Sequence, residues 1–284
     1  MEKKIYSDFT YESESFIHEL FRKRKAAALT GAGISEESGI STFRGDNGIW
    51  KRYNPAIYAN LPGLGFTLLV APHKVINFIT EVFDTLINAK PNPGHFALAE
   101  LENQGILSSI ITQNIDNLHQ EVGSKRVIEL HGNMFEFRCM KCNCKRKLSK
   151  GELASIMDEL KNSRKSLFAI KKILIKCNCG GKMRPNAVLF GEVLDQTKIS
   201  DAYKEINNNE VLLIIGTSGV VYPAAYLPWY AKEIGKTIIE INPDRSKFSE
   251  IANYFVKGKA GEVLPSVIEQ IFGVTLMNDK EGCL

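Results

Sequence analysis

A short apolar run that leads directly into a glycine-rich turn constrains the fold of this chain more than any other feature. Residues 26–30 read Ala-Ala-Ala-Leu-Thr and predict a buried strand, and residues 31–39 continue with Gly-Ala-Gly-Ile-Ser-Glu-Glu-Ser-Gly. A strand followed by Gly-x-Gly at the start of a helix is how a doubly wound sheet receives a pyrophosphate. Glycine lets the backbone approach the phosphates, and the helix N-terminus supplies N–H groups. The stretch therefore predicts an α/β domain that binds a nucleotide.

The usual dehydrogenase fingerprint is incomplete here. Its third glycine would fall at position 36, which is Glu36. The acidic ribose ligand expected about 20 residues further on is also missing, since that region runs from Trp50 to Pro55. We therefore expect a nucleotide loop of another kind, and ordinary hydride transfer loses support.

Further apolar runs extend the predicted sheet, and amphipathic segments alternate with them. Buried strands are predicted at residues 106–112, 126–130, 211–215, 237–241 and 254–256. Helices are predicted at residues 12–25, 75–86, 95–103 and 261–272. We expect a functional loop over Ile40–Pro55 and a break in the chain at Leu61–Gly65, where proline and glycine gather. The alternation predicts a doubly wound parallel α/β sheet.

Polar residues follow several of these strands. Gln113, Asn114 and Asp116 come directly after the strand at 106–112, where four of five consecutive side chains are polar. Asn114 or Asp116 could instead cap a helix, but so dense a polar run favours a ligand role. Gly216, Thr217 and Ser218 follow residues 211–215, and Asn242 follows residues 237–241. Because parallel strands end at one edge of a sheet, these residues should line one crevice.

His131 lies at the end of the predicted strand 126–130, within Glu129-Leu130-His131-Gly132-Asn133. A histidine after an apolar run is often a packed core residue. Its place at the same sheet edge as Asn114 and Asp116 favours a general base instead, because the ordinary imidazole pKa of about 6.5 is close to working pH.

Paired cysteines predict a tetrahedral structural zinc site in a reducing compartment. A second pair, Cys177-x-Cys179, follows Cys139-x-x-Cys142 later in the sequence, so the expected ligands are Cys139, Cys142, Cys177 and Cys179. One residue separates the cysteines of the second pair, where two are usual, and 34 residues separate Cys142 from Cys177. Cys144 could replace one ligand. Four thiolates leave no open position, so this metal should hold structure and perform no chemistry.

Composition limits the classes of function. Charged residues make up 24% of the chain, and no apolar run approaches the ~20 residues that span a bilayer. The first residues do not resemble a secretory signal, so we expect a cytoplasmic protein without membrane contact. Residues 141–176 carry a net charge of +8, which we interpret as a solvated helical insert. A docking surface for acidic partners is the alternative, and nucleic acid is not an expected partner.

The motifs taken together resemble one family, the sirtuins, in their bacterial form. The resemblance covers roughly residues 15–272 in collinear order, and so many separate motifs in sequence make it specific. It is carried by Gly31–Ser35 with Ser38–Ile40, Thr42–Arg44, Thr112–His119, His131–Asn133, the cysteine pairs, Arg184-Pro185, Phe190–Glu192, Gly216–Ser218 and Pro223–Ala225.

The resemblance implies an NAD-consuming protein-lysine deacylase with two domains. A Rossmann-like NAD-binding domain would comprise residues 1–45, 95–133 and 187–284. A small domain would be formed by a helical insertion at 46–94 and a zinc-ribbon insertion at 134–186. The acyl-lysine peptide would pair as a strand between two segments of the protein. Such pairing takes its affinity mainly from backbone hydrogen bonds.

Site residues are implied in the same way. His131 would be the base that lets the ribose 2′-oxygen attack the imidate formed from the acyl group, with Asn114 and Asp116 holding the nicotinamide ribose and carboxamide. The products would be free lysine and 2′-O-acyl-ADP-ribose. Implied NAD contacts are Gly31, Ala32, Ser35, Phe43, Arg44, Gln113, Asn114, Asp116, Gly216, Thr217, Ser218, Asn242 and Ala260. Implied substrate contacts are Val188, Phe190, Gly191, Val220 and Tyr222.

Substrate preference and rival functions complete the expectations. Sirtuins that favour succinyl or malonyl groups carry Tyr-x-x-Arg in the small domain; the stretch Asn77–Phe83 has neither residue, so acetyl is expected first. One alternative on the same fold is a mono-ADP-ribosyltransferase or NAD glycohydrolase. Another is a non-catalytic NAD-sensing or docking module, which would not need His131, Asn114 and Asp116. We expect acyl-lysine proteins as partners and a monomer or weak oligomer.

Overall fold

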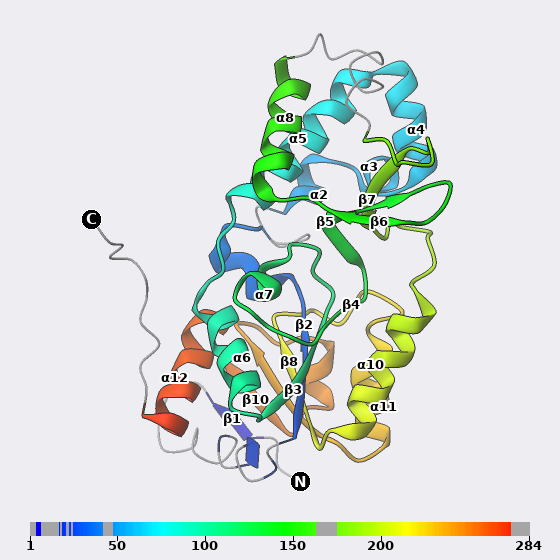
Figure 1. The fold of residues 1–284 in the computed structure, drawn as a ribbon. Coiled ribbons are helices and arrows are strands. Elements are labelled where there is room, and N and C mark those ends of the chain that lie inside the picture. The colour runs from blue at the N-terminus through cyan, green and yellow to red at the C-terminus, as the bar shows by residue number, and fades with distance from the viewer. Residues whose placement is uncertain are drawn as a thin grey trace, which may run out of the picture.

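The computed structural model of the chain describes residues 4–6, 17, 19–20, 23, 25–41, 48–162 and 175–273. Two bodies are visible, a large parallel sheet flanked by helices and a smaller helical and antiparallel unit (Figure 1). The expected helix at 12–25 lies largely outside the described residues, although Ile17 and Leu20 are buried in the core of the large body.

The large sheet has seven strands in the order β1-β10-β9-β8-β2-β3-β4. All of its pairings are parallel. Without β1, the order is the one typical of dinucleotide-binding folds, and the chain changes direction across the sheet between β2 and β8. The strands are β1 (Lys4–Tyr6), β2 (Ala26–Thr30), β3 (Leu107–Thr112), β4 (Val127–Glu129), β8 (Val211–Ile215), β9 (Thr237–Asn242) and β10 (Tyr254–Lys257).

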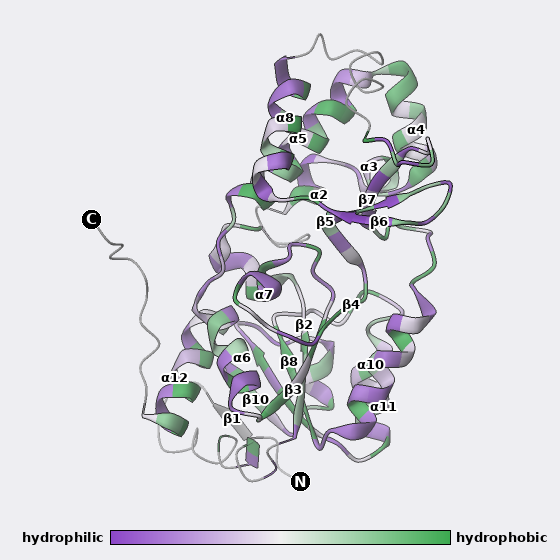
Figure 2. Cartoon of the chain, in the orientation of Figure 1, coloured by the Kyte–Doolittle hydropathy of each residue, from purple (hydrophilic) through white to green (hydrophobic). Residues whose placement is uncertain are grey.

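Both faces of this sheet are covered, which explains why its central strands β2 and β8 are almost entirely apolar (Figure 2). Along β2, Ala26 and Ala28 face one core while Ala27 and Leu29 face the other. The first core contains α6 (Pro93–Asn103) and α12 (Ala260–Phe272). The second contains α10 (Gln196–Asn208), α11 (Tyr226–Glu233) and the 3-10 helix η2 (Lys247–Glu250). The expected doubly wound sheet is confirmed.

The smaller unit is built on a three-stranded antiparallel sheet, ordered β6-β5-β7. Phe83, Phe137 and Leu153 belong to a core that joins this sheet to two helices. The strands are β5 (Gly132–Cys139), β6 (Lys145–Lys147) and β7 (Met183–Ala187). The helices are α2 (Ile49–Arg52), α3 (Pro55–Tyr58), α4 (Leu61–Val70), α5 (Pro72–Asn88) and α8 (Lys150–Asn162).

The helix expected after the Gly-x-Gly turn is present at residues 32–38 as a 3-10 helix, η1 (Ala32–Ser38). Local expectations were wrong in two places. The expected loop at 40–55 contains α2 and ends where α3 begins. Residues 61–65 open α4 instead of breaking the chain, because the Asn60 side chain accepts a hydrogen bond from Gly63 N–H and Pro62 suits the first turn.

Two loops at the carboxyl ends of β2 and β8 interlock without side chains between them. Gly31 N–H donates to Ile215 O at 3.0 Å, and Gly33 N–H donates to Gly216 O at 2.8 Å. Gly216 has φ +61°, and a Cβ there would lie 2.4 Å from the Ile34 nitrogen. The glycines of the predicted phosphate loop are therefore required by this contact between two backbones.

Replacement of Gly216 by alanine should destabilise the protein more than the same change at Gly235. Both residues have positive φ, but a Cβ at Gly235 would have no atom within 4 Å. Gly235→Ala should cost roughly 1 kcal/mol of strain, whereas Gly216→Ala adds a backbone clash and should cost at least about 2 kcal/mol more. Denaturant unfolding of both variants measures the difference; equal losses would contradict the interlock.

Candidate active site

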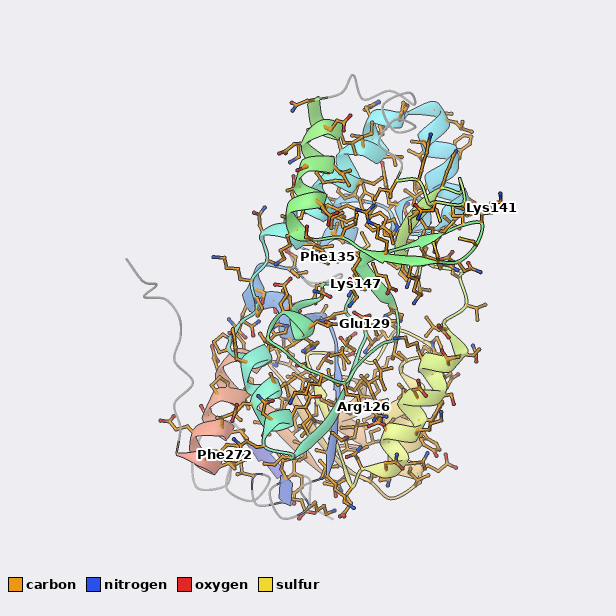
Figure 3. The ribbon with its side chains drawn as sticks, in the orientation of Figure 1. Arg126, Glu129, Phe135, Lys141, Lys147 and Phe272 are labelled. Atoms are coloured by element: carbon orange, nitrogen blue, oxygen red, sulfur yellow. The ribbon has the colours of Figure 1, made fainter. Side chains whose placement is uncertain are left out.

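The segment that joins the two bodies runs alongside the loop after β3. Leu130 N–H donates to Thr112 O at 2.9 Å, and Met134 N–H donates to Ile115 O at 3.0 Å. Between them, the Nδ1 atom of His131 lies 2.9 Å from Gln113 O. Figure 3 follows this path from Arg126, through Glu129 between the bodies, to Phe135 in the smaller one.

The protonation of His131 follows from that contact. A carbonyl oxygen only accepts hydrogen bonds, so Nδ1 carries the proton and Nε2 keeps its lone pair. Burial lowers the pKa of His131, and the hydrogen bond to Gln113 opposes this shift. At neutral pH the imidazole is therefore neutral, with Nε2 able to accept a proton.

Gly132 allows His131 to sit against the return strand. It has φ +78°, and a Cβ there would lie 1.8 Å from the Asn186 carbonyl oxygen. The His131 carbonyl accepts a 2.9 Å hydrogen bond from Val188 N–H. The residue after the histidine must therefore be glycine for β5 to pair with β7 so closely.

Asn114 and Asp116 are almost fully buried beside this segment, at 6% and 4% exposure. Asn114 Nδ2 lies 3.1 Å from both Gly31 O and Ser35 Oγ. Asp116 accepts from the Ser35 hydroxyl at 2.7 Å and from Leu118 N–H at 3.0 Å. Burial raises the pKa of Asp116, and these two hydrogen bonds oppose the rise. The structure thus brings the predicted amide and carboxylate together.

Ser35 lies beneath these side chains. It is 0% exposed, and its hydroxyl proton is directed at Asp116. In this structure its side chain supports Asp116, a residue that the resemblance, like Ser35 itself, assigns to NAD.

The remaining residues expected around a dinucleotide form one connected row along the sheet edge. Gln113 Nε2 donates to Thr217 Oγ1 at 3.0 Å, and Asn242 Nδ2 donates to Thr217 O at 3.1 Å. Thr217, Asn242 and Ala260 are all less than 10% exposed, while Ser218 is exposed. Phe43 and Arg44 lie outside the described residues.

The predicted substrate segments lie on the side of the smaller unit and near α11. Phe190 N–H donates to Ala59 O at 2.7 Å, which joins the segment after β7 to the α3–α4 connection. Phe190 is 50% exposed and Gly191 is exposed. On the other segment, Tyr222 is 52% exposed and contacts the Tyr226 ring edge-on; Val220 is partly exposed.

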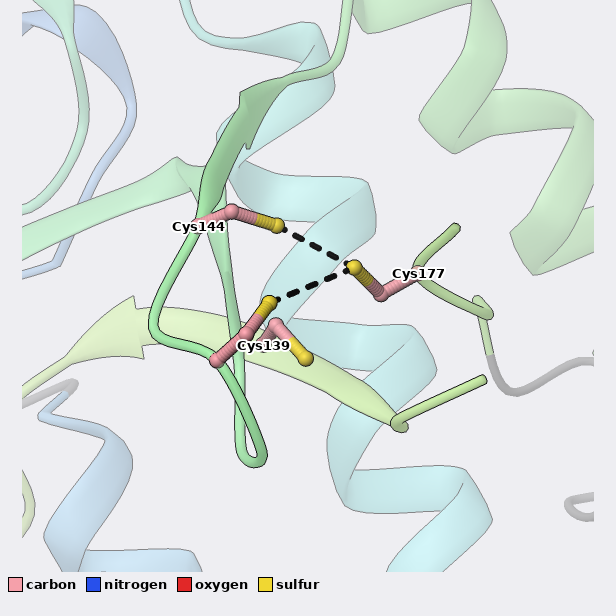
Figure 4. A group of neighbouring side chains, drawn as sticks. Cys139, Cys144 and Cys177 are labelled. Carbon is pink, nitrogen blue, oxygen red and sulfur yellow. Dashed lines mark hydrogen bonds between the residues drawn. The ribbon is translucent and has the colours of Figure 1, made fainter. Parts of the chain in front are cut away.

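Five cysteine sulfurs gather at one end of β5. Figure 4 shows Cys139, Cys144 and Cys177 of this group. The sulfurs of Cys139, Cys142, Cys144 and Cys177 lie within 4.8 Å of one another. Cys179 joins the group through a 3.5 Å contact with Cys139. The thiol-rich donor set fits zinc, and Cys144 is an additional candidate ligand beside the four expected ones.

Sequence reasoning missed the layer beneath the site. His95, His119, Thr30 and Thr112 are buried and hydrogen-bonded below Asn114 and Asp116. His119 stands within the polar run after β3, but an isolated sequence does not show that its side chain turns inward. Asn92, whose side chain caps α6, was the available signal that His95 lies in the first turn of a helix.

No helix among the described residues is long and apolar enough to cross a membrane.

The chain was compared with known families, curated proteins and solved structures. The model of the Sir2 family matches residues 31–223. An NAD-dependent protein deacylase of Pyrococcus abyssi is 43% identical, with 89% of this chain and 95% of the relative covered. An NAD-dependent protein deacylase of Thermococcus kodakarensis is 45% identical, with 89% of this chain and 93% of the relative covered.

Solved structures agree. A Sir2 homologue in complex with NAD superposes with a TM-score of 0.77 at 37% identity, with 95% of this chain and 96% of that chain covered. A mutant Sir2 with a deacetylated p53 peptide and 3′-O-acetyl-ADP-ribose superposes with a TM-score of 0.75 at 33% identity, with 92% of this chain and 98% of that chain covered. With a family model over more than half of its length and relatives above 40% identity, this chain belongs to the Sir2 family, the sirtuins.

Proposed function

We propose that this protein is an NAD-dependent protein-lysine deacylase that transfers the acyl group of lysine to ADP-ribose and releases nicotinamide. The observation that carries the proposal is the protonation of His131. Its Nδ1 is held by the Gln113 carbonyl, so the free Nε2 is the basic atom of an imidazole that stays neutral at working pH. A module that only bound NAD would have no need of such a base.

NAD fits the row of polar groups at the edge of the large sheet. Bound NAD supplies a ribose carbon that becomes electrophilic as nicotinamide leaves. Asn114 and Asp116 would hold the nicotinamide ribose and carboxamide, and His131 would accept a proton from a ribose hydroxyl. Thr217 and Asn242, which are joined by a 3.1 Å hydrogen bond, would face the adenosine part. This row crosses the sheet at β2 and β8, where nucleotides bind in doubly wound folds.

The exposed Ser218 and the backbone of Gly31, Ala32 and Gly216 would serve the phosphates and adenosine. The family resemblance assigns Phe43 to the ribose face and Arg44 to the phosphates. Ser35 would act through Asp116, because the Ser35 hydroxyl donates its hydrogen bond to the Asp116 carboxylate.

The acyl-lysine substrate would lie between Val188–Glu192 and Gly219–Tyr222. In the first segment the N–H groups of Val188, Leu189, Phe190 and Glu192 already donate within the chain. An incoming peptide strand would therefore use carbonyl oxygens of this segment as acceptors. Backbone pairing of this kind accepts many side chains, so selectivity for the flanking sequence should be loose.

One structural zinc fits the cysteine cluster. Tetrahedral Zn–S bonds of about 2.3 Å place ligand sulfurs about 3.8 Å apart. The Cys142–Cys177 and Cys139–Cys179 distances of 3.6 and 3.5 Å approach this value, whereas Cys144 lies 3.1 Å from Cys177. The four sulfurs that all lie within 4.8 Å of one another are those of Cys139, Cys142, Cys144 and Cys177, so the geometry also admits Cys144 in place of Cys179. We propose the two sequence pairs, Cys139 with Cys142 and Cys177 with Cys179, as the ligands, and Cys144 as the alternative fourth ligand.

The two bodies are proposed to act as two domains, the smaller comprising residues 46–94 and 134–186. We further propose that the protein works in the cytoplasm, on acyl-lysine proteins, as a monomer or weak oligomer.

Replacement of His131 by alanine should remove deacylation and leave NAD binding largely intact. Loss of a general base lowers the rate by about 10² to 10⁴ fold. The assay is incubation with NAD and an acetyl-lysine peptide, followed by detection of O-acetyl-ADP-ribose. His73→Ala, which changes an exposed histidine on α5, is the matched control. NAD loss that needs no peptide would instead favour a glycohydrolase.

The pH dependence follows from the same histidine. Because burial lowers its pKa, His131 stays neutral as pH falls to 6.5, and protonation removes the base only below that value. The wild-type kcat/KM should therefore fall with a one-proton slope at a pH below 6.5. A fall centred above pH 7 would contradict this assignment.

Zinc content should depend on four of the five clustered cysteines. Cys139→Ser and Cys179→Ser should lower bound zinc, measured by atomic absorption, and lower the melting temperature, because metal binding contributes to folding of the smaller unit. Cys144→Ser should retain one zinc per chain. Loss of zinc in Cys144→Ser together with its retention in Cys179→Ser would reverse the ligand assignment.

Acetyl-lysine should be removed faster than succinyl-lysine from otherwise identical peptides. A succinyl carboxylate requires a cation, and Arg52 beside α5 is already ion-paired with Glu81, which also accepts from the Tyr53 hydroxyl. The measurement is kcat/KM for the two peptides at saturating NAD. Faster turnover of the succinyl peptide would overturn the preference.

A further inference from the structure

Two buried histidines lie in contact beneath the active site. His95 on α6 and His119 on α7 (Leu118–Glu121) are 0% and 1% exposed. Their ring centroids are 4.9 Å apart. Burial lowers the pKa of His119 to about 4, and burial together with His119 lowers that of His95. Both imidazoles are therefore neutral at neutral pH, and each has one donor and one acceptor nitrogen.

The donor nitrogen of His95 is fixed by the start of α6. Asn92 N–H points at His95 Nδ1 at 3.3 Å, so Nδ1 is the acceptor and Nε2 carries the proton. Nε2 faces the Ser35 hydroxyl oxygen at 3.5 Å, and that hydroxyl donates to Asp116 at 2.7 Å. This chain of contacts leads from His95 to the carboxylate of the site.

His119 begins a second chain of contacts, which leads to Asn114. Its Nε2 lies 3.0 Å from Thr30 Oγ1, and Thr30 donates to Thr112 Oγ1 at 2.8 Å. Thr112 Oγ1 also accepts from Asn114 N–H at 3.0 Å. Thr30 and Thr112 are the last residues of β2 and β3, so this series of hydrogen bonds crosses between the two strands at the level of the site.

The direction of these hydrogen bonds assigns the proton on His119. The Thr30 proton is used toward Thr112, so the Thr30 oxygen accepts from His119 Nε2–H. Nδ1 of His119 has no partner in the part of the chain that the structure describes. A buried acceptor without a partner is tolerated better than a buried N–H, which also favours the proton on Nε2.

We propose that His119 is a positioning residue for the deacylation reaction. As a neutral donor it orients the hydroxyls of Thr30 and Thr112, and through them the backbone at Asn114. The residue is 1% exposed, so it acts on the substrates only through Asn114. The inference rests on the proposed function of Asn114, and it adds a residue that the mechanism above does not use.

The experiment compares His119→Phe, which keeps a ring against His95 and removes the donor, with His119→Gln, whose amide nitrogen can replace Nε2. The phenylalanine variant should lose roughly tenfold in kcat/KM for NAD, as expected for one hydrogen bond that aligns the site. Its KM for the acetyl peptide should stay unchanged, because the peptide binds elsewhere. The glutamine variant should recover most of the loss.

Thr30→Val tests the same series of hydrogen bonds at the residue that follows His119 in it. It should reproduce the loss of His119→Phe, and the double variant should lose no more than either single one. His73→Phe makes the same substitution at an exposed histidine and should retain wild-type kinetics. Wild-type kcat/KM in His119→Phe, additive losses in the double variant, or a parallel rise in peptide KM would each overturn the proposal.

A spectroscopic measurement does not depend on the folding of any variant. In wild-type protein labelled with ¹⁵N-histidine, His119 should show a neutral ring with the proton on Nε2 at pH 7. A proton on Nδ1 would overturn the assignment. If the wild-type protein releases no nicotinamide in the presence of acetyl peptide, the proposed function fails and this inference with it. A failure of the inference alone appears only in the variants.

Discussion

The parallel register of β2 between β3 and β8 is the constraint on which the site depends. Thr30 is paired with Thr112 on one side and with Ile215 on the other, so three strands end at the same level. The backbone then has to turn in three neighbouring loops at once. Glycines let two of these loops touch directly, and the third loop delivers the amide and carboxylate beside them.

The large sheet could be predicted from sequence, and so could the placement of Gln113, Asn114 and His131 near one edge of it. The strand at Val211–Ile215 matches its predicted bounds because a strand buried on both faces is apolar without interruption. Helix α4 could not be predicted, since its glycines and proline suggest a break and only the Asn60 cap, visible in three dimensions, explains the helix. His95 and His119 were missed for a related reason, because a single buried histidine carries no periodic pattern.

The buried polar layer explains how such a site remains ordered without a ligand. Asn114 and Asp116 lie almost entirely out of water, where polar groups without partners would each cost roughly 1–3 kcal/mol. Ser35 is a hydrogen-bond partner of both side chains, the Gly31 carbonyl and Leu118 N–H are further partners, and Thr112 accepts from the Asn114 backbone. The site is thus preorganised by residues that would never contact the substrates.

The position of His131 between the two sheets has a mechanical consequence. The residue follows β4 of the large sheet and precedes β5 of the small one, and its carbonyl holds the returning chain at Val188. His131 and Val188, the first residue of the proposed acyl-lysine segment, are therefore joined by one backbone hydrogen bond, so any shift of the chain at this crossing moves both of them together.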